Sequence, residues 1–294
     1  MSMEQHSTTP PSGVWPRRLW GGLGAAATAL VLACAVPAST AAIVKVTGPA
    51  DAARRVEERT IEQPVESVSV SADAGDVAVR GASSDRAQVR LDMNFGVDGS
   101  GAGAGVDRGT RLTLRSQCAA RCRAAHSLAV PQDVEVQMVA VGGTQNVSGI
   151  SGELTLSAGS ADTVLDDVSG AVDVVNESGW VRGTGLRSEE VSVQGGSSTV
   201  DLRFSELPGS VEVSLDSGST TIELPAGTDA GRCTVETDTD GEVVVDLPEA
   251  AAEGASRETD DASGADCALR LTSGGGDITV TGADAEAFPT PRRD

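Results

Sequence analysis

The residues best placed to do chemistry in this chain are its cysteines. Cys233 precedes the run TVET and Cys267 precedes the run ALRL, so the two cysteines hold equivalent positions in two similar segments. If these segments are neighbouring strands of a parallel sheet, the cysteines lie about 4.8 Å apart, within reach of a disulfide. We therefore predict a Cys233–Cys267 disulfide that joins two consecutive units of the fold.

A second pair, Cys118 and Cys122, lies in the run CAARC. This spacing predicts a local disulfide across a turn, and half of a zinc site is the alternative. A second pair of ligands is not found nearby in the sequence, where His126 is the one histidine. Together with the first pair, these cysteines form an even set of four, which favours an oxidising compartment.

Histidine and aspartate offer little further chemistry. His126 is the only histidine beyond the N-terminal region, no G-x-S-x-G motif accompanies it, and we expect it in an exposed loop. The pairs Asp73/Asp76 and Asp238/Asp240 lie at turn sequences, where aspartate bonds the turn backbone; weak divalent-cation binding is the alternative. We predict no catalytic residue, no metal ligand and no cofactor.

Trp180 is the only tryptophan in the repeated part of the chain, and we consider it as a ligand platform or as a cover for the sheet beside a glycine. Asp166 and Asp167 are expected at a solvated corner. A carbohydrate-active enzyme would need a convergent pair of carboxylates, and the sequence nominates no such pair.

Charge and composition exclude several classes of partner. The chain of 294 residues has a net charge of -21, which argues against binding to nucleic acid or to an anionic membrane surface. It contains no Tyr, three Trp and three Phe, so its interior must be filled by Val, Leu and Ile.

The N-terminal region predicts a membrane segment. Residues 1–18 read as a disordered cytoplasmic tail, and residues 19–44 contain no charged side chain over a length that can cross a bilayer. We predict a single-pass anchor; a cleaved secretory signal and a lipoprotein signal with lipidated Cys34 are the alternatives. Each places the following residues outside the cytoplasm, after a polar spacer over 45–64.

From residue 65 onward, short alternating runs recur between Gly, Ser, Asp and Asn. From Val134 through Leu154, Val172 and Val191 to Val211 the steps are 20, 18, 19 and 20 residues. The runs are 68–79, 134–147, 154–165, 172–183, 191–202, 211–224, 235–247 and 269–280. Each unit reads as two short strands joined by a glycine-bearing turn. The period favours an all-β solenoid, resembling a β-helix, over a β-sandwich.

The remaining segments interrupt or flank this repeat domain, which we assign to 65–285. In the section 84–131, two strand-like runs are joined by DGSGAGAGVDRG (98–109), which we interpret as a flexible hairpin loop. Residues 249–266 form an acidic loop between the last two units, and residues 286–294 form a tail.

The repeats SADAGDVAVRG, VDVVNESGWVRGTGL and ALRLTSGGGDITVTG, behind one apolar segment, carry a family resemblance. The chain resembles the bacterial putative-adhesin family of β-strand-repeat domains of unknown function. The resemblance covers about 65–285 and implies an extracytoplasmic, solenoid-like domain without catalytic residues. In SAGSADTVL and QGGSSTVDL the family's usual glycine–aspartate pair is eroded.

We therefore expect a membrane-anchored, extracytoplasmic domain that acts in adhesion, envelope interaction or assembly rather than catalysis. Its expected partner is an unidentified component of the cell envelope or surface, and its end strands invite self-association. Two alternatives stay open: a polysaccharide-processing β-helix enzyme, and an envelope-stress or regulatory sensor.

Overall fold

A computed structural model describes residues 44–47, 54–94, 101–106, 110–117, 123–248 and 267–283. These residues form β-strands and one short 3-10 helix, η1 (Thr228–Arg232). Among them, none belongs to an apolar helix of the length that crossing a bilayer requires. Residues 19–43 of the expected anchor, the acidic loop 249–266, the tail 286–294 and the predicted pair Cys118–Cys122 lie outside the described residues.

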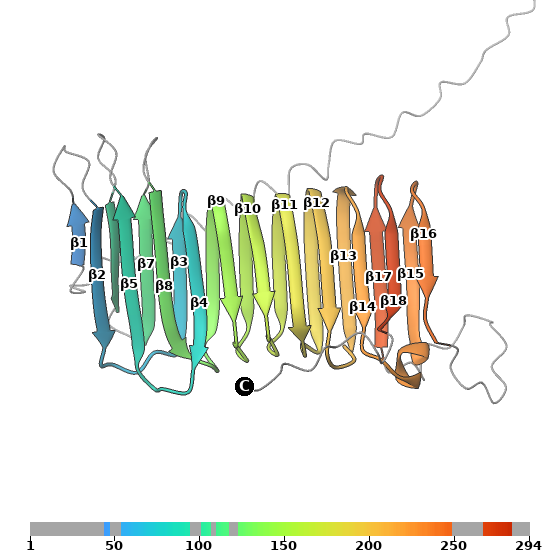
Figure 1. Ribbon diagram of the computed structural model, residues 1–294, viewed down its shortest axis with the longest axis horizontal. Helices are drawn as coiled ribbons and strands as arrows, with labels where there is room; N and C mark the ends of the chain where they lie inside the picture. Colours follow the sequence, from blue (N-terminus) through green and yellow to red (C-terminus); the bar gives the residue numbers. More distant parts are fainter. Residues whose placement is uncertain are drawn as a thin grey trace, which may run out of the picture. The chain divides into compact units, whose positions relative to one another are not determined.

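Four long parallel strands make up the centre of the fold (Figure 1). They are β9 (Glu135–Ser148), β10 (Leu154–Asp166), β11 (Val172–Leu186) and β12 (Glu190–Phe204). Each has a first and a second segment on either side of a turn, and we call such a unit a rung. The first segments of neighbouring rungs pair with each other, and so do the second segments.

The register confirms the repeat that the sequence predicts, with one shift. Val172 pairs with Leu154, and Val191 pairs with Val172. Leu154 pairs with Val136 rather than with Val134, the residue from which the sequence period was counted. The shift is two residues, which leaves every side chain on its predicted face because strand side chains alternate with a period of two.

At the C-terminal end, the order of the rungs departs from the order of the sequence. Strands β13 (Ser210–Ser217) and β14 (Thr220–Leu224) pair with the two segments of β12. The next rung is β17 (Cys267–Ser273) and β18 (Ile278–Gly282), which pair with β13 and β14. The outermost rung is β15 (Cys233–Thr239) and β16 (Val243–Asp246), although it comes earlier in the chain.

The side chains that face inward explain this order. In β17 the inward positions hold Leu269 and Leu271, both buried, which can pack against a neighbouring rung on either side. Their partners in β15 are Val235 and Thr237, both only partly buried. Leu269 and Leu271 are thus covered on both sides, whereas the hydroxyl of Thr237 stays partly exposed at the end of the stack, where one side faces water.

The N-terminal end is built partly from antiparallel strands. Strands β3 (Ser67–Ala72) and β4 (Asp76–Ala82) pair in parallel with β9 on one side and with β7 (Arg111–Gln117) and β8 (Arg123–Pro131) on the other. Strands β5 (Ala87–Asn94) and β6 (Gly101–Val106) then pair antiparallel with β8 and β7. The last strands, β2 (Arg54–Ile61) and β1 (Val44–Thr47), pair antiparallel with β5 and β6.

Strand β6 contradicts the sequence interpretation of 98–109 as a flexible loop. Its sequence GAGAGV has weak strand propensity, but the edge of β7 offers it a complete set of backbone partners. Strands β1 and β2 likewise extend the paired region into residues 45–64, which the sequence analysis assigned to a polar spacer.

The core consists of aliphatic side chains stacked in columns, as the composition requires. One column holds Val136, Leu154, Val172, Val191, Val211 and Leu269, all at most 2% exposed. Phe204 is the only aromatic side chain in this core of described residues. Each buried side chain of this kind contributes about 1.5–3 kcal/mol before the entropy cost of ordering the chain, so one rung is marginal and the stack must act cooperatively.

The Cys233–Cys267 disulfide predicted from the sequence is confirmed. The two Cα atoms are 4.5 Å apart and the two sulfur atoms 2.14 Å apart, and the residues face each other across β15 and β17. The bond joins the outermost rung to the rung beside it.

The turn between the two segments of a rung, which we call the first corner, explains the recurring glycine. Gly75 and Gly276 have φ angles of 110° and 140°, in the region that favours glycine. A Cβ atom on Gly75 would lie 2.4 Å from the carbonyl oxygen of Ala124, and one on Gly276 would lie 2.2 Å from that of Gly218. The positive φ angle and the close carbonyl oxygen each exclude a side chain at this position. DAGDVAV (73–79) and GGGDITV (274–280) therefore share a glycine because both form the same corner of the fold.

The aspartate after this glycine caps the neighbouring rung. Oδ1 of Asp76 accepts a hydrogen bond from the backbone N–H of Thr144 at 3.1 Å. Oδ1 of Asp277 does the same for Glu242 at 3.1 Å. The recurring glycine–aspartate phrase therefore has a structural role, in which the carboxylate satisfies a backbone donor of the next rung.

Candidate binding surfaces

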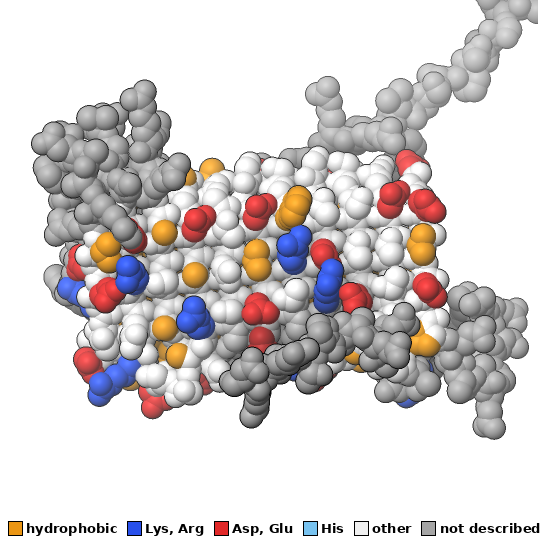
Figure 2. Space-filling view, in the orientation of Figure 1, with side chains coloured by type: hydrophobic (Ala, Val, Ile, Leu, Met, Phe, Trp, Pro, Cys, Tyr) orange, Lys and Arg blue, Asp and Glu red, His pale blue; other side chains and the backbone are white. Residues whose placement is uncertain are grey.

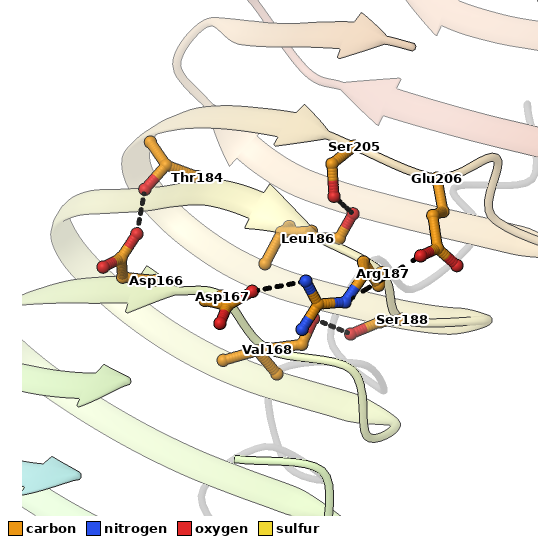
Figure 3. Close-up of polar contacts among 9 residues, drawn as sticks. All are labelled: Asp166, Asp167, Val168, Thr184, Leu186, Arg187, Ser188, Ser205 and Glu206. Carbon is orange, nitrogen blue, oxygen red and sulfur yellow. Dashed lines mark hydrogen bonds and ion pairs between the residues drawn. The ribbon is translucent and has the colours of Figure 1, made fainter. Parts of the chain in front are cut away.

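The second corner, where one rung passes to the next, is held by polar contacts between rungs (Figure 3). The hydroxyl of Thr184 donates a hydrogen bond to Oδ1 of Asp166 at 2.9 Å. Nη1 of Arg187 lies 2.6 Å from Oδ1 of Asp167, and its Nε lies 4.0 Å from Oε1 of Glu206. These side chains are largely exposed, so each ion pair contributes less than about 1 kcal/mol to stability.

Asp167 also has a special backbone conformation, with a φ angle of 54°. Gly149 and Gly185 hold the same corner position in the neighbouring rungs and have φ angles of 63°. Aspartate tolerates this left-handed region better than most residues do. The exposed position of Asp166 and Asp167 agrees with the solvated corner predicted from the sequence, and their contacts account for both residues structurally.

The outward side chains of the first segments and of the residues directly beside them, from β9 to β15, form a surface that we call the acidic face. Its exposed carboxylates are Glu135, Glu153, Asp173, Glu177, Glu190, Glu212, Asp216, Glu236, Asp238 and Asp240. Arg270 is the one basic residue at these outward positions, and its Nε lies 3.1 Å from Oε2 of Glu236. Such a row of like charges creates a negative potential that attracts cationic partners and is screened by salt.

The outward side chains of the second segments carry both signs of charge. Nε of Arg203 lies 3.4 Å from Oδ1 of Asp201 and 3.5 Å from Oε2 of Glu223 on the next rung. Nε of Arg182 lies 3.9 Å from the other oxygen of Asp201. In the face drawn in Figure 2, acidic, basic and hydrophobic side chains likewise stand singly or in small groups among uncharged ones.

Trp180 lies on this mixed surface at the first corner of β11, and it is 56% exposed. Its backbone N–H donates a hydrogen bond to Oδ1 of Asp162 at 3.0 Å. The guanidinium carbon of Arg182 lies 5.3 Å from the centroid of the indole ring, within the range of a cation–π contact. An exposed aromatic ring beside a guanidinium can stack against a planar or apolar ligand group, so Trp180 has the geometry that a ligand platform needs.

Asp201 and Glu223 form the arrangement that comes nearest to a pair of catalytic carboxylates with a basic residue. Both carboxylates are paired with Arg203, and both belong to an outward sheet surface. The guanidinium between them holds two anions, which is a structural role for an ion-pair network on neighbouring strands.

His126 lies in the core, and the prediction of an exposed loop histidine is wrong. It belongs to β8 and is 3% exposed, and its Nε2 lies 2.8 Å from the hydroxyl oxygen of buried Ser116. Its Nδ1 has no hydrogen-bond partner in the described part of the chain. Burial lowers the pKa of His126 to about 4, against the opposing effect of the Asp92 carboxylate, so the ring is neutral at neutral pH. Alternation along β8 was the signal that could have placed this side chain inward.

Within the described ranges, no group of three or more His, Cys, Asp or Glu side chains is arranged to hold a metal ion. A depression of about 450 Å³ lies near the second corners of β10, β11 and β12 and is lined by Ser169, Ala171, Glu189, Glu190, Gly209 and Ser210. This lining holds two carboxylates and two serine hydroxyls, and no basic side chain belongs to it.

No family model matches the chain, and no curated protein sequence matches it. Solved structures do match, and those described below are 10–12% identical to this chain. A "putative cell adhesion protein" from Clostridium sporogenes is 12% identical, covers 78% of this chain and 100% of its own, and has a TM-score of 0.33. A "putative adhesin" from Parabacteroides merdae is 10% identical, with 78% and 97% covered and a TM-score of 0.40.

A "putative lipid binding protein" from Parabacteroides distasonis is also similar, with 10% identity, 78% and 95% of the two chains covered and a TM-score of 0.31. The names of the adhesins agree with the family that the sequence resembles. At these scores the likeness carries no argument about function, which must come from the chain itself.

The residues singled out in the sequence differ in how the structure places them. It brings Cys233 and Cys267 together and exposes Trp180 beside Arg182. Sequence reasoning missed the network around Arg203, because only the register of neighbouring rungs shows that Asp201 and Glu223 flank it.

Proposed function

We propose that this protein is a membrane-anchored, extracytoplasmic β-solenoid that displays its outer faces to a component of the cell envelope or surface, as an adhesin does. The acidic face carries this proposal. Each rung from β9 to β13 carries at least one of these carboxylates, and in the register Asp173 and Glu212 lie two strand spacings apart with Ser192 between them, about 9.6 Å. The corners of these strands are held in place by glycine and aspartate. A rigid array of charges loses little entropy on binding, which favours recognition of an extended partner.

Trp180 and Arg182 supply a second contact of a different kind. Exposed tryptophan and arginine side chains are enriched among the residues that contribute most to binding interfaces. The pair would give a local anchor, while the acidic face would give longer-range attraction. A non-catalytic role fits this division better than the polysaccharide-processing alternative does, because Asp201 and Glu223 are already engaged in ion pairs with Arg203.

The test is capture of envelope components by the purified chain, with matched variants. In one variant, Glu153→Gln, Asp173→Asn and Glu212→Gln remove three charges from the acidic face. The control removes three exposed charges elsewhere, by Asp85→Asn, Asp133→Asn and Glu189→Gln. The proposal predicts that the first variant loses captured material, that the control retains it, and that added salt weakens capture by the wild-type chain.

Equal capture by both variants, or no capture of envelope material by the wild-type chain, would contradict the proposal. A Trp180→Ala variant tests the second contact, because it deletes the indole ring and keeps the backbone N–H that donates to Asp162. Protease treatment of intact cells tests the location independently, since an extracytoplasmic domain is cut from outside while a cytoplasmic protein is protected.

A further inference from the structure

The outermost rung, β15 and β16, presents an open strand edge. Each of these strands pairs on one side only, β15 with β17 and β16 with β18, and no described strand covers the other side. Val243, Val244 and Val245 are 43%, 41% and 47% exposed. They are three consecutive exposed valines in one described strand. An open edge with unpaired N–H and C=O groups is a template for another strand.

The backbone groups that point outward can be assigned from the hydrogen bonds on the inner side. The N–H of Ile278 donates to the carbonyl of Glu242 at 2.8 Å, so Glu242 and Val244 direct their backbone groups toward β18. By alternation, Val243 and Val245 direct theirs toward the open edge. On the first segment, the N–H of Ala268 donates to Gly209 on the β13 side, so Leu269 and Leu271 bond to β15.

The partners of Leu269 and Leu271 in the register are Val235 and Thr237. When two residues face each other in a pair of parallel strands, only one of them forms backbone hydrogen bonds with the opposite strand. The backbone N–H and C=O groups of the other residue point to the far side of its own strand. Val235 and Thr237 therefore direct their N–H and C=O groups to the open edge, as Val243 and Val245 do. The open edge offers hydrogen bonds along both segments of the rung.

Charge decides which strand fits this edge. The outward side chains of β15 and of the turn after it include Glu236, Asp238 and Asp240, and Asp246 ends β16. The carboxylates of Asp238, Asp240 and Asp246 have no hydrogen-bond or ion-pair partner among the described residues, whereas that of Glu236 is already paired with Arg270. A second copy of the same edge would place like charges opposite one another, which is unfavourable.

Neighbouring rungs of this protein already show how such carboxylates are matched. Arg270 meets Glu236 at 3.1 Å, Arg203 meets Glu223 at 3.5 Å and Arg182 meets Asp201 at 3.9 Å, each across one strand spacing. An added strand with basic side chains at alternate positions would repeat this pairing with Asp238 and Asp240. Its other side chains would cover the partly exposed Val235 and Thr237.

We propose that the outer edge of β15 and β16 binds an extended segment of a partner protein in which apolar and cationic residues alternate, adding one more rung to the stack. Main-chain hydrogen bonds provide affinity in this mode, and alternate side chains provide specificity. The proposal concerns the edge of the last rung. It shares Asp238 and Asp240 with the acidic face, but it does not require that face to capture an envelope component.

The probe is a fluorescent peptide of alternating arginine and valine, matched to the 7 residues of β15, and it is titrated with the purified full-length chain in a fluorescence anisotropy assay. A peptide of the same composition with all arginines in one block tests for charge attraction alone, and an alternating glutamate–valine peptide tests for the sign of the charge. The alternating cationic peptide should bind at least about tenfold more tightly than either control.

Two sets of variants locate the site. Thr237→Pro with Val245→Pro removes two outward N–H groups and leaves those that bond to β17 and β18, so peptide affinity should fall at least about tenfold. Thr237→Ala with Val245→Ala is the matched control, because it shortens the same side chains and keeps both N–H groups. Asp238→Asn with Asp240→Asn should weaken binding and reduce its salt dependence without a change in fold, as circular dichroism can verify.

Equal binding of the alternating and block peptides would overturn the proposal, since it would show attraction to charge without strand pairing. Unchanged affinity in the folded proline variant would overturn it as well. Concentration-dependent dimers in sedimentation velocity that the proline variant abolishes would assign the edge to a second copy of the chain instead.

Discussion

Removing the Cys233–Cys267 disulfide should release the outermost rung while the rest of the stack stays folded. The bond closes a segment with a sequence separation of 34 residues, for which the chain-entropy model gives about 4 kcal/mol of stabilisation. Among the described strands, β15 and β16 each pair on one side only, so their rung has fewer strand-to-strand hydrogen bonds than a rung with neighbours on both sides. The energy of opening it therefore depends strongly on this cross-link.

The assay is native-state hydrogen exchange of the Cys233→Ala, Cys267→Ala double variant. A loss of about 4 kcal/mol corresponds to a rise of roughly 1,000-fold in the opening equilibrium. The increase should be confined to the amides of β15 and β16, and the amides of β10, β11 and β12 should keep their protection. A Cys118→Ala, Cys122→Ala variant is the control, because it removes two cysteines without touching the outermost rung.

Two results would refute this reasoning. If β15 and β16 exchange equally in the double variant and the wild type, the bond does not hold the rung. If all strands lose protection together, the outermost rung is not a separate opening unit.

Three further predictions test other parts of the structure. Because burial lowers the pKa of His126 to about 4, the unfolded chain binds more protons than the folded chain between pH 6.5 and 4. The contribution of neutral, buried His126 to the free energy of unfolding is therefore fully present above pH 6.5. It falls by up to about 3 kcal/mol as the pH drops toward 4. Denaturant melts of wild type and His126→Gln should diverge over that range, and parallel curves would speak against this origin. Gly276→Ala should lower the free energy of unfolding by about 2–3 kcal/mol, because the positive φ of Gly276 and the nearby carbonyl of Gly218 both disfavour a Cβ atom. Gly275→Ala is the control and should be nearly neutral, because nothing lies close to the position of its Cβ atom. Equal melting temperatures of the two variants would be inconsistent with the corner geometry. Asp162→Ala should cost about 1 kcal/mol by leaving the N–H of Trp180 without its cap, and a thermal melt indistinguishable from wild type would contradict the capping role.

Much of the fold follows from local pattern. Alternation placed Leu154, Val172 and Val191 inward, and the equivalence of Cys233 and Cys267 followed from the residues after each. Both depend on a period of two, which survives an error of two residues in register such as the one at Val134.

The remaining features depend on contacts between rungs, which no single segment encodes. The sequence GAGAGV reads as a loop because its strand propensity is low, yet the edge of β7 makes it a strand. The order of the last two rungs depends on whether Thr237 or Leu271 tolerates an end position better. Candidate binding residues are harder still, since the contact between Trp180 and Arg182 is visible only once both side chains have been placed on the strand.

The order of rungs at the C-terminal end is the claim on which the open edge of β15 and β16 depends, and engineered disulfides test it directly. Ser214 and Thr272 are partners in the register and point outward, so Ser214→Cys with Thr272→Cys should form a disulfide under mild oxidation. Ser214→Cys with Asp238→Cys should not, because these strands are about 9.6 Å apart, two strand spacings. Cross-linking of 214 to 238 in place of 214 to 272 would show that the rungs follow sequence order, and it would contradict the account.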